Sequence, residues 1–152
     1  MTLENAAITE TDGSIKLFAF YSADLHAGML ASVNRDYVRF NGDGVRGKIQ
    51  EFEVPSLSVK SLLDKHGIRE FDLLQIDTEG YDYNILMQFL DNGILPQIIH
   101  FEHNFLTGAQ RTEVALRFSA LGYAFLAIGI DTLAYLQKSN QSFENRVKGA
   151  KY

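Results

Sequence analysis

The sequence predicts an α/β fold with a mostly parallel sheet and a β-rich N-terminal region. The chain has 152 residues, which suits one domain, and 46% of them are hydrophobic, which is ordinary for a globular protein. From residue 58 onward helical and strand patterns alternate, and helices between strands imply crossover connections in a largely parallel sheet. Before residue 58 only short strands and turns are indicated.

The N-terminal third is predicted to hold four short strands. Residues 5–8 and 15–21 are strand candidates, and residues 22–34 show no clean period and are expected to form a loop. Asn-Gly and Asp-Gly dipeptides within residues 41–44 are strong hairpin signals. Residues 36–54 are therefore interpreted as two strands joined by a turn.

Residues 42–47, GDGVRG, also satisfy the glycine pattern of dinucleotide-binding loops. That pattern requires a helix directly after it, whose N-terminus meets the pyrophosphate. Here the following residues alternate as a strand does. A hairpin turn accounts for the glycines better than a nucleotide site.

The remaining elements follow in alternation. Ser58 is a candidate N-cap and Gly67 a candidate stop for the first helix. Residues 71–77 and 97–103 are apolar on both faces, as central parallel strands are. The other expected elements are helices over 80–92 and 109–121 and strands over 123–129 and 132–137.

Composition excludes several classes of protein. The absence of cysteine rules out disulfides and zinc–thiolate sites. The net charge of −5 argues against broad nucleic-acid binding, although residues 138–152 form a basic tail. The first ten residues lack the features of a secretory signal, and the longest apolar run is too short to span a bilayer. We therefore expect a cytoplasmic protein with neither nucleic-acid nor membrane partners.

Ionisable side chains follow two consecutive predicted strands. Asp77 and Glu79 come at the end of the first, and Glu102 and His103 at the end of the second. Ligands of open parallel sheets bind beyond these carboxyl ends. The group could bind a divalent metal or take a proton from a hydroxyl.

A structural role is the alternative for part of this group. Glu79 and Asp82 fall near a helix N-terminus, where the helix dipole favours a carboxylate. Asp77 still belongs to the strand, so the dipole does not explain it. Asp77 is therefore the strongest candidate for function.

Residues 53–90, together with PQIIHFEHN at 96–104, resemble the FkbM-type methyltransferases. The hallmark of that family is a strand ending in Lys-Ile-Asp-x-Glu-Gly, followed by an acidic residue and a helix. The residues that match are Ile76, Asp77, Glu79 and Gly80, whereas Gln75 replaces the usual lysine and Asp82 a common glutamate.

The resemblance implies a Rossmann-like fold that transfers a methyl group from S-adenosylmethionine, usually to an oxygen of a small molecule or sugar. Asp77 would contact the methionine part of the cofactor or position the acceptor, and Asn5 and Ala6 would lie near the adenine. Glu102 and His103 would end the fifth strand of the family fold. Asp77 or His103 would be the base, with a divalent metal as a further expectation.

The resemblance also implies a domain truncated at its N-terminus, because the family's glycine-rich turn and ribose-binding acid would precede residue 1. We expect residues 1–137 to be a partial methyltransferase domain that binds S-adenosylmethionine weakly or not at all and is inactive alone. Two alternatives stay open: a non-catalytic remnant acting by binding or assembly, and a metal-dependent hydrolase using Asp77, Glu79 and His103.

A partial domain would expose one edge of its sheet at residues 71–77. An unpaired apolar edge is an aggregation hazard that folded chains cover. We expect residues 4–8 or 14–21 to pair there, with a homodimer through a second copy as the other solution. The internal strand is favoured because loop closure costs less than immobilising a partner.

Overall fold

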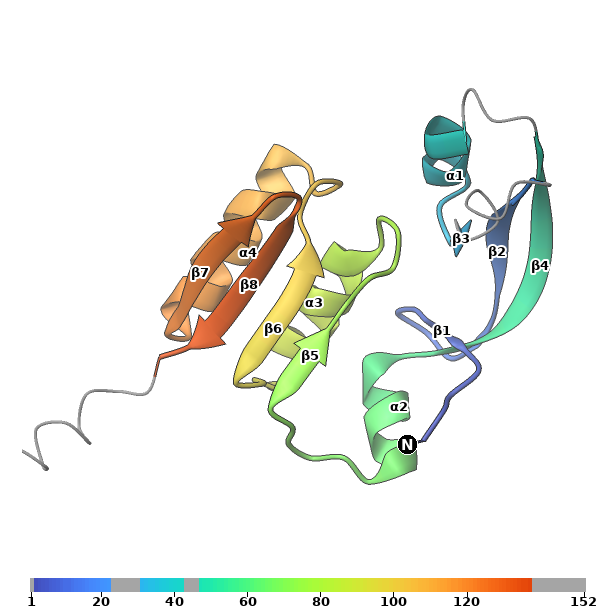
Figure 1. Ribbon diagram of the computed structural model, residues 1–152. Helices are drawn as coiled ribbons and strands as arrows, with labels where there is room; N and C mark the ends of the chain where they lie inside the picture. The colour runs from blue at the N-terminus through green and yellow to red at the C-terminus, as the bar shows by residue number, and fades with distance from the viewer. Residues whose placement is uncertain (1, 23–30, 43–46, 138–152) are drawn as a thin grey trace, which may run out of the picture.

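The computed structural model describes residues 2–22, 31–42 and 47–137, which form two four-stranded sheets with helices beside them (Figure 1). The N-terminal sheet has the order β1-β4-β2-β3, and its strands are β1 (Ala7–Ile8), β2 (Gly13–Ser22), β3 (Ala31–Ser32) and β4 (Gly47–Leu57). The C-terminal sheet has the order β5-β6-β8-β7, and its strands are β5 (Leu73–Gln75), β6 (Ile98–Glu102), β7 (Tyr123–Ile128) and β8 (Asp131–Leu136). The helices are α1 (Arg35–Gly42), α2 (Val59–His66), α3 (Asp82–Asp91) and α4 (Gly108–Ala120).

A long antiparallel pair, β2 with β4, dominates the N-terminal sheet. Its register runs from Gly13 opposite Ser56 to Ser22 opposite Gly47. The predicted strand at residues 36–40 is wrong, because that segment belongs to α1. The partner of β4 is therefore β2. The turn was expected at residues 41–47, but Asn41 and Gly42 end α1 and Gly47 begins β4, and residues 43–46 lie outside the described residues.

Local and distant contacts together explain why α1 is a helix. The Asn34 side chain accepts hydrogen bonds from the backbone N–H groups of Asp36, at 3.0 Å, and of Tyr37, at 3.2 Å. An asparagine in this place is a favourable N-cap. Tyr37 and Val38 are buried and pack against Phe18 and its neighbours on the sheet. Strand-forming residues thus become helical because burial outweighs propensity.

The expectation of a mostly parallel sheet is also wrong. Only β5 and β6 pair in parallel in the C-terminal sheet, and only β1 and β4 do so in the N-terminal sheet. β7 and β8 are joined by residues 129–130 and form an antiparallel hairpin. β8 lies between β6 and β7, antiparallel to both. The α4 crossover was correctly inferred, but the final strand separates the two strands that it connects.

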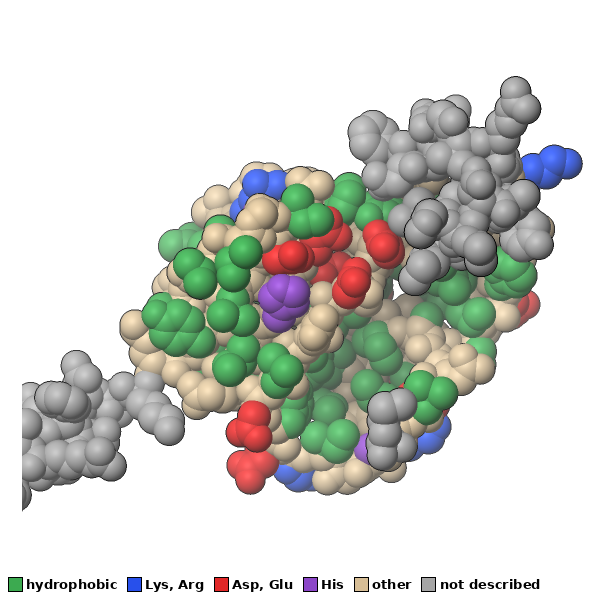
Figure 2. Space-filling view, in the orientation of Figure 1, with side chains coloured by type: hydrophobic (Ala, Val, Ile, Leu, Met, Phe, Trp, Pro, Cys, Tyr) green, Lys and Arg blue, Asp and Glu red, His purple; other side chains and the backbone are tan. Residues whose placement is uncertain are grey.

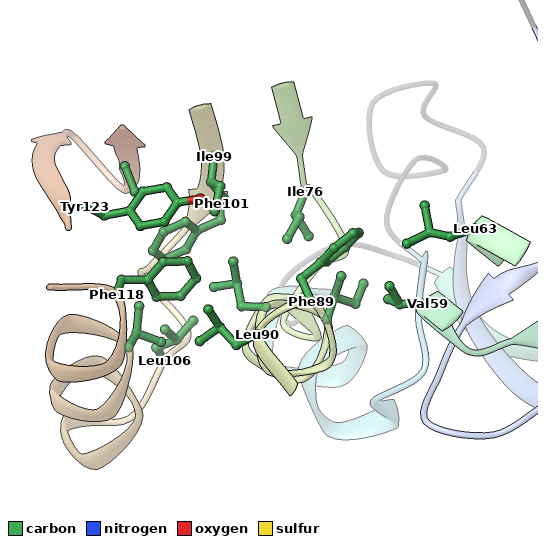
Figure 3. Close-up of a cluster of buried hydrophobic side chains, with 14 residues drawn as sticks. Val59, Leu63, Ile76, Phe89, Leu90, Ile99, Phe101, Leu106, Phe118 and Tyr123 are labelled. Atoms are coloured by element: carbon green, nitrogen blue, oxygen red, sulfur yellow. The ribbon is translucent and has the colours of Figure 1, made fainter. Parts of the chain in front are cut away.

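α3 and α4 cover one face of the C-terminal sheet and enclose the main core (Figures 1 and 3). Sequence signals set the ends of the helices: Ser58 caps α2, Gly67 ends it in a left-handed conformation, and Thr107 forms a capping box with Gln110 at α4. The core residues labelled in Figure 3 are Val59, Leu63, Ile76, Phe89, Leu90, Ile99, Phe101, Leu106, Phe118 and Tyr123.

The opposite face of this sheet carries exposed apolar side chains. Leu73, Ile98 and Tyr135 stand in register across β5, β6 and β8. Figure 2 shows this face with hydrophobic side chains beside a group of acidic ones. No helix in the described part of the chain covers it (Figure 1).

β5 is an edge strand of the C-terminal sheet among the described residues. The expectation that an N-terminal strand pairs with it is therefore wrong, since both expected segments lie in the N-terminal sheet. β2 has its own long partner in β4, and that pair satisfies more backbone groups than pairing with the three residues of β5 would.

Of the helices described, none combines the length and the apolar character needed to cross a membrane.

Candidate functional site

A cleft of about 330 Å³ lies at the carboxyl ends of β5 and β6, on the uncovered face of the C-terminal sheet. We call it the acidic cleft. Its lining residues are Gln75, Ile76, Asp77, Glu79, His100, Glu102, Ile130 and Asp131. Acidic side chains and a histidine gather on this face in Figure 2. The structure thus brings together three of the four candidates, Asp77, Glu79 and Glu102.

The turn after β5 carries two of these carboxylates in an unusual backbone conformation. Glu79 has a φ of 53° and is the only non-glycine residue with positive φ among those described. Gly80 follows with a φ of 93°. Positive φ is costly for a side-chain-bearing residue, so surrounding contacts must hold Glu79 in place.

Those contacts come from the N-terminal sheet and α1. The Ser32 hydroxyl donates a hydrogen bond to the Glu79 backbone oxygen at 2.8 Å, and the Tyr37 hydroxyl donates to the Glu79 carboxylate. Burial, and then the Glu79 carboxylate, hold the pKa of Tyr37 above its ordinary value, so the hydroxyl stays protonated. The Tyr37 ring also meets Phe105 edge to face at 4.4 Å between ring centres. Two distant segments therefore fix the position of Glu79.

Asp82 links the two strand ends beneath the cleft. Its side chain is buried, accepts a hydrogen bond from the Thr78 hydroxyl at 2.8 Å and accepts another from the backbone N–H of Glu102 at 3.1 Å. One carboxylate thereby joins the turn after β5 to the end of β6. This structural role is more specific than the dipole interaction that the sequence suggested.

The carboxyl group of Glu102 has a raised pKa. Partial burial, followed by the nearby charges of Asp82, Glu79, Asp77 and Asp131, raises the pKa of Glu102 to about 7. Desolvation and like charges both disfavour the ionised form. A carboxyl group with this pKa can accept and release a proton near neutral pH.

The structure separates His103 from the other candidates. His103 follows Glu102 and points to the opposite side of the sheet, where its Nδ1 lies 2.9 Å from the Thr132 hydroxyl. The set Asp77, Glu79 and His103, which the hydrolase alternative required, does not line one cleft. Within the described ranges, no three His, Asp or Glu side chains are arranged to hold a metal ion.

The expected adenine-binding residues lie near the same turn. Ala6 lines a hollow of about 250 Å³ together with Thr78 and Tyr81, on the side of the N-terminal sheet. Asn5 precedes it and is not part of that lining. Ala6 is therefore close in space to the turn that carries Asp77 and Glu79.

Asp131 and Tyr37 belong to the site or contact it, but the sequence did not indicate either of them. Asp131 reaches the cleft because it stands opposite Glu102 in the pairing of β6 with β8. Tyr37 contacts Glu79 from α1, a helix that the sequence did not predict. No local signal marks either residue, because both depend on which distant segments become neighbours.

The sequence was compared with models of known protein families. Residues 2–125 match the Methyltransferase FkbM domain. The chain belongs to this family. No curated protein and no solved structure matches the chain. The strand, turn and helix that carry Asp77, Glu79 and Gly80 lie within the matched FkbM residues.

Methyltransferases generally use S-adenosylmethionine, which carries a sulfonium and an ammonium group. Four carboxylates line the acidic cleft of this FkbM domain, and no lysine or arginine lies among its lining residues within the described chain. Opposite charges attract most strongly where water is partly excluded. The chemistry of the cleft therefore fits the cationic part of that cofactor.

Proposed function

We propose that this domain takes part in methyl transfer from S-adenosylmethionine to a hydroxyl group of a small molecule or sugar, at the acidic cleft. Family membership supports the reaction class. The observation that carries the proposal is the Glu102 carboxyl group, whose pKa of about 7 suits a general base and which shares the cleft with Asp77 and Glu79.

Each residue has a definite role in this proposal. Glu102 takes the place of Asp77 or His103 as the base and accepts the proton of the acceptor hydroxyl, because burial and neighbouring charges raise the pKa of its carboxyl group. Asp77, which is exposed at the end of β5, holds the cationic part of the cofactor. Tyr37 and Ser32 keep Glu79 directed toward the same cleft.

When bound, S-adenosylmethionine would supply an electrophilic methyl carbon whose former bonding pair leaves with the sulfur. The residues of the chain would provide orientation and proton transfer. Proton transfer by a positioned group contributes about 10²–10⁴-fold to a rate. Alignment of the acceptor oxygen beside Glu102 adds a proximity effect.

Calorimetry with S-adenosylmethionine tests the binding step. We expect weak binding, with a dissociation constant on the order of 1 mM, since carboxylates in contact with water contribute little individually. D77N is expected to weaken binding about fivefold or more. E70Q is the matched control, because Glu70 is also exposed and lies outside the cleft.

Methyl transfer to a panel of sugars and small alcohols, at saturating cofactor, tests the chemical step. The rate is expected to rise with pH through about 7 as Glu102 loses its proton. E102Q should lower the rate about 100-fold or more, whereas E70Q should leave it unchanged. Absence of both cofactor binding and transfer would overturn the proposal and support a domain that acts by binding or assembly.

A further inference from the structure

A second hollow, of about 290 Å³, lies on the helix-covered face of the C-terminal sheet, between α4 and the hairpin of β7 and β8. We call it the α4 groove. Its lining residues are Phe101, His103, Leu106, Arg111, Val114, Ala115, Phe125, Ala127 and Thr132. It shares no lining residue with the acidic cleft.

Small side chains on both walls account for the open space. Ala115 comes from α4 and Ala127 from β7, and each leaves room that a larger residue would fill. Phe101 and Val114 are buried at the base, whereas Phe125 is 36% exposed despite belonging to the packed face. The groove is therefore an accessible apolar surface inside the packing between helix and sheet, near the lower limit of volume for small-molecule sites.

One end of the groove carries a fixed positive charge. The Arg111 Nε donates a hydrogen bond to the Leu106 backbone oxygen at 3.0 Å, and Nη2 donates to the Asn104 backbone oxygen at 3.0 Å. These bonds hold the guanidinium at the loop after β6, where His103 also lies. No carboxylate in the described ranges forms an ion pair with Arg111. Backbone carbonyls orient this cation, and no described carboxylate neutralises its charge.

The α4 groove, which is apolar and has an oriented guanidinium at one end, is complementary to an apolar molecule that carries one negative charge. We propose that the α4 groove binds a small apolar carboxylate, a short alkyl or single-ring acid, with its carboxylate on Arg111. The hydrocarbon part lies over Phe101, Val114 and Phe125. Arginine is well suited to this contact because its planar N–H groups match a carboxylate.

The probes are octanoate and its neutral analogue octanamide, which share the same alkyl chain. Binding is followed by two-dimensional amide NMR of the whole chain, so that affected residues are identified directly. Octanoate is expected to shift amides of α4 and of the β7–β8 hairpin and to bind at least about tenfold more tightly than octanamide. Equal affinity of the two compounds would overturn the assignment of the charge to Arg111.

Two variants separate the charge from the cavity. R111Q is expected to weaken octanoate about tenfold and to leave octanamide unchanged. A115L fills the groove, keeps Arg111 and should remove binding of both compounds, with A127L as the second filling variant should A115L fail to fold. R35Q, which removes an exposed cation in the N-terminal sheet region, is the control and should change neither affinity.

Three results would refute the site: no octanoate binding at millimolar concentration, amide shifts confined to the uncovered sheet face, or unchanged octanoate affinity in R111Q. Arg111, Ala115 and Ala127 do not line the acidic cleft. Failure of the octanoate experiment would therefore leave the methyl-transfer proposal untouched, and failure of that proposal would leave this one untouched.

Discussion

Replacement of Gly80 by alanine tests how tightly the site turn is held. Gly80 has a φ of 93°, and an ideal Cβ built there would lie 2.8 Å from Cδ2 of the Tyr37 ring. The backbone conformation costs an alanine about 1–2 kcal/mol. Crowding against a packed ring adds about 1–3 kcal/mol. We therefore expect G80A to lower the free energy of unfolding by about 2–5 kcal/mol.

Urea denaturation followed by circular dichroism measures this loss. With a typical slope for a small protein, the midpoint should fall by about 1–2 M urea. G67A is the matched control, because Gly67 has a φ of 64° and a Cβ added there would meet nothing within 4 Å. Only the backbone part, about 1–2 kcal/mol, should appear there.

A double-mutant cycle isolates the contact with the ring. Y37A removes the atoms that the new methyl group would meet, so G80A should cost less in that background by about 1–3 kcal/mol. Equal losses in G80A and G67A, or a coupling energy below about 0.5 kcal/mol, would show that the turn is not clamped by Tyr37.

Three further predictions concern the cleft and the sheet edge. D82N should lower the pKa of Glu102 from about 7 toward its ordinary value, because Asp82 is the leading neighbouring charge. The same change should lower the free energy of unfolding by about 1–3 kcal/mol, because it weakens buried hydrogen bonds. Carbon-13 NMR titration measures the pKa, and urea denaturation measures the stability. The folded state binds the Glu102 proton more tightly than the unfolded state does, so stability should fall as pH rises from about 4.5 to about 7, by about 1–2 kcal/mol after screening. E102Q should flatten that part of the stability curve, and an unchanged slope would contradict the raised pKa. At the open edge, the amides of Leu73 and Gln75 should exchange rapidly with deuterium while the Ile76 amide, bonded to the backbone oxygen of His100, exchanges slowly. Protection of Leu73 and Gln75 together with a dimeric mass would instead show that a second copy pairs there.

The ends of helices that have cap or stop residues could be predicted closely from the sequence. α2 begins after Ser58 and ends before Gly67, as its cap residues indicate. α3 and α4 also fall within the predicted ranges of 80–92 and 109–121, apart from one residue at the start of α4. Such boundaries depend on hydrogen bonds between near neighbours, which sequence patterns record directly.

Elements that depend on distant partners were predicted less well. Residues 36–40 contain aromatic and β-branched side chains that favour a strand, yet they form α1 because Asn34 caps it and Tyr37 and Val38 find a place on the sheet. Likewise, nothing local indicates that β8 inserts beside β6. Asp131 therefore joins Glu102 only in the folded chain.

The candidate carboxylates at the ends of β5 and β6 could be predicted because chain direction in a parallel pair places both ends on one rim. β5 and β6 pair in parallel, so Asp77 and Glu102 line one cleft. His103 could not be placed by the same reasoning. It lies one residue further along an extended chain, and successive side chains of a strand point to opposite faces.

The energetic character of the turn after β5 distinguishes it from the rest of the chain. At other places local rules hold: α2 and α4 have side-chain caps, and the other residues with positive φ in the described chain are glycines. Around the turn after β5, positive φ at Glu79, a buried carboxylate at Asp82 and a raised carboxyl pKa at Glu102 occur close together. Each feature has an energetic cost: a glycine at position 79 would avoid the first, and uncharged residues at positions 82 and 102 would avoid the other two. Costs of this kind concentrate at functional sites because a catalytic or binding group must be held where folding alone would not place it. These features lie on β5, the turn after it, α3 and β6, all within the residues that match the FkbM domain, and they support the proposal that methyl transfer takes place at the acidic cleft rather than at the α4 groove.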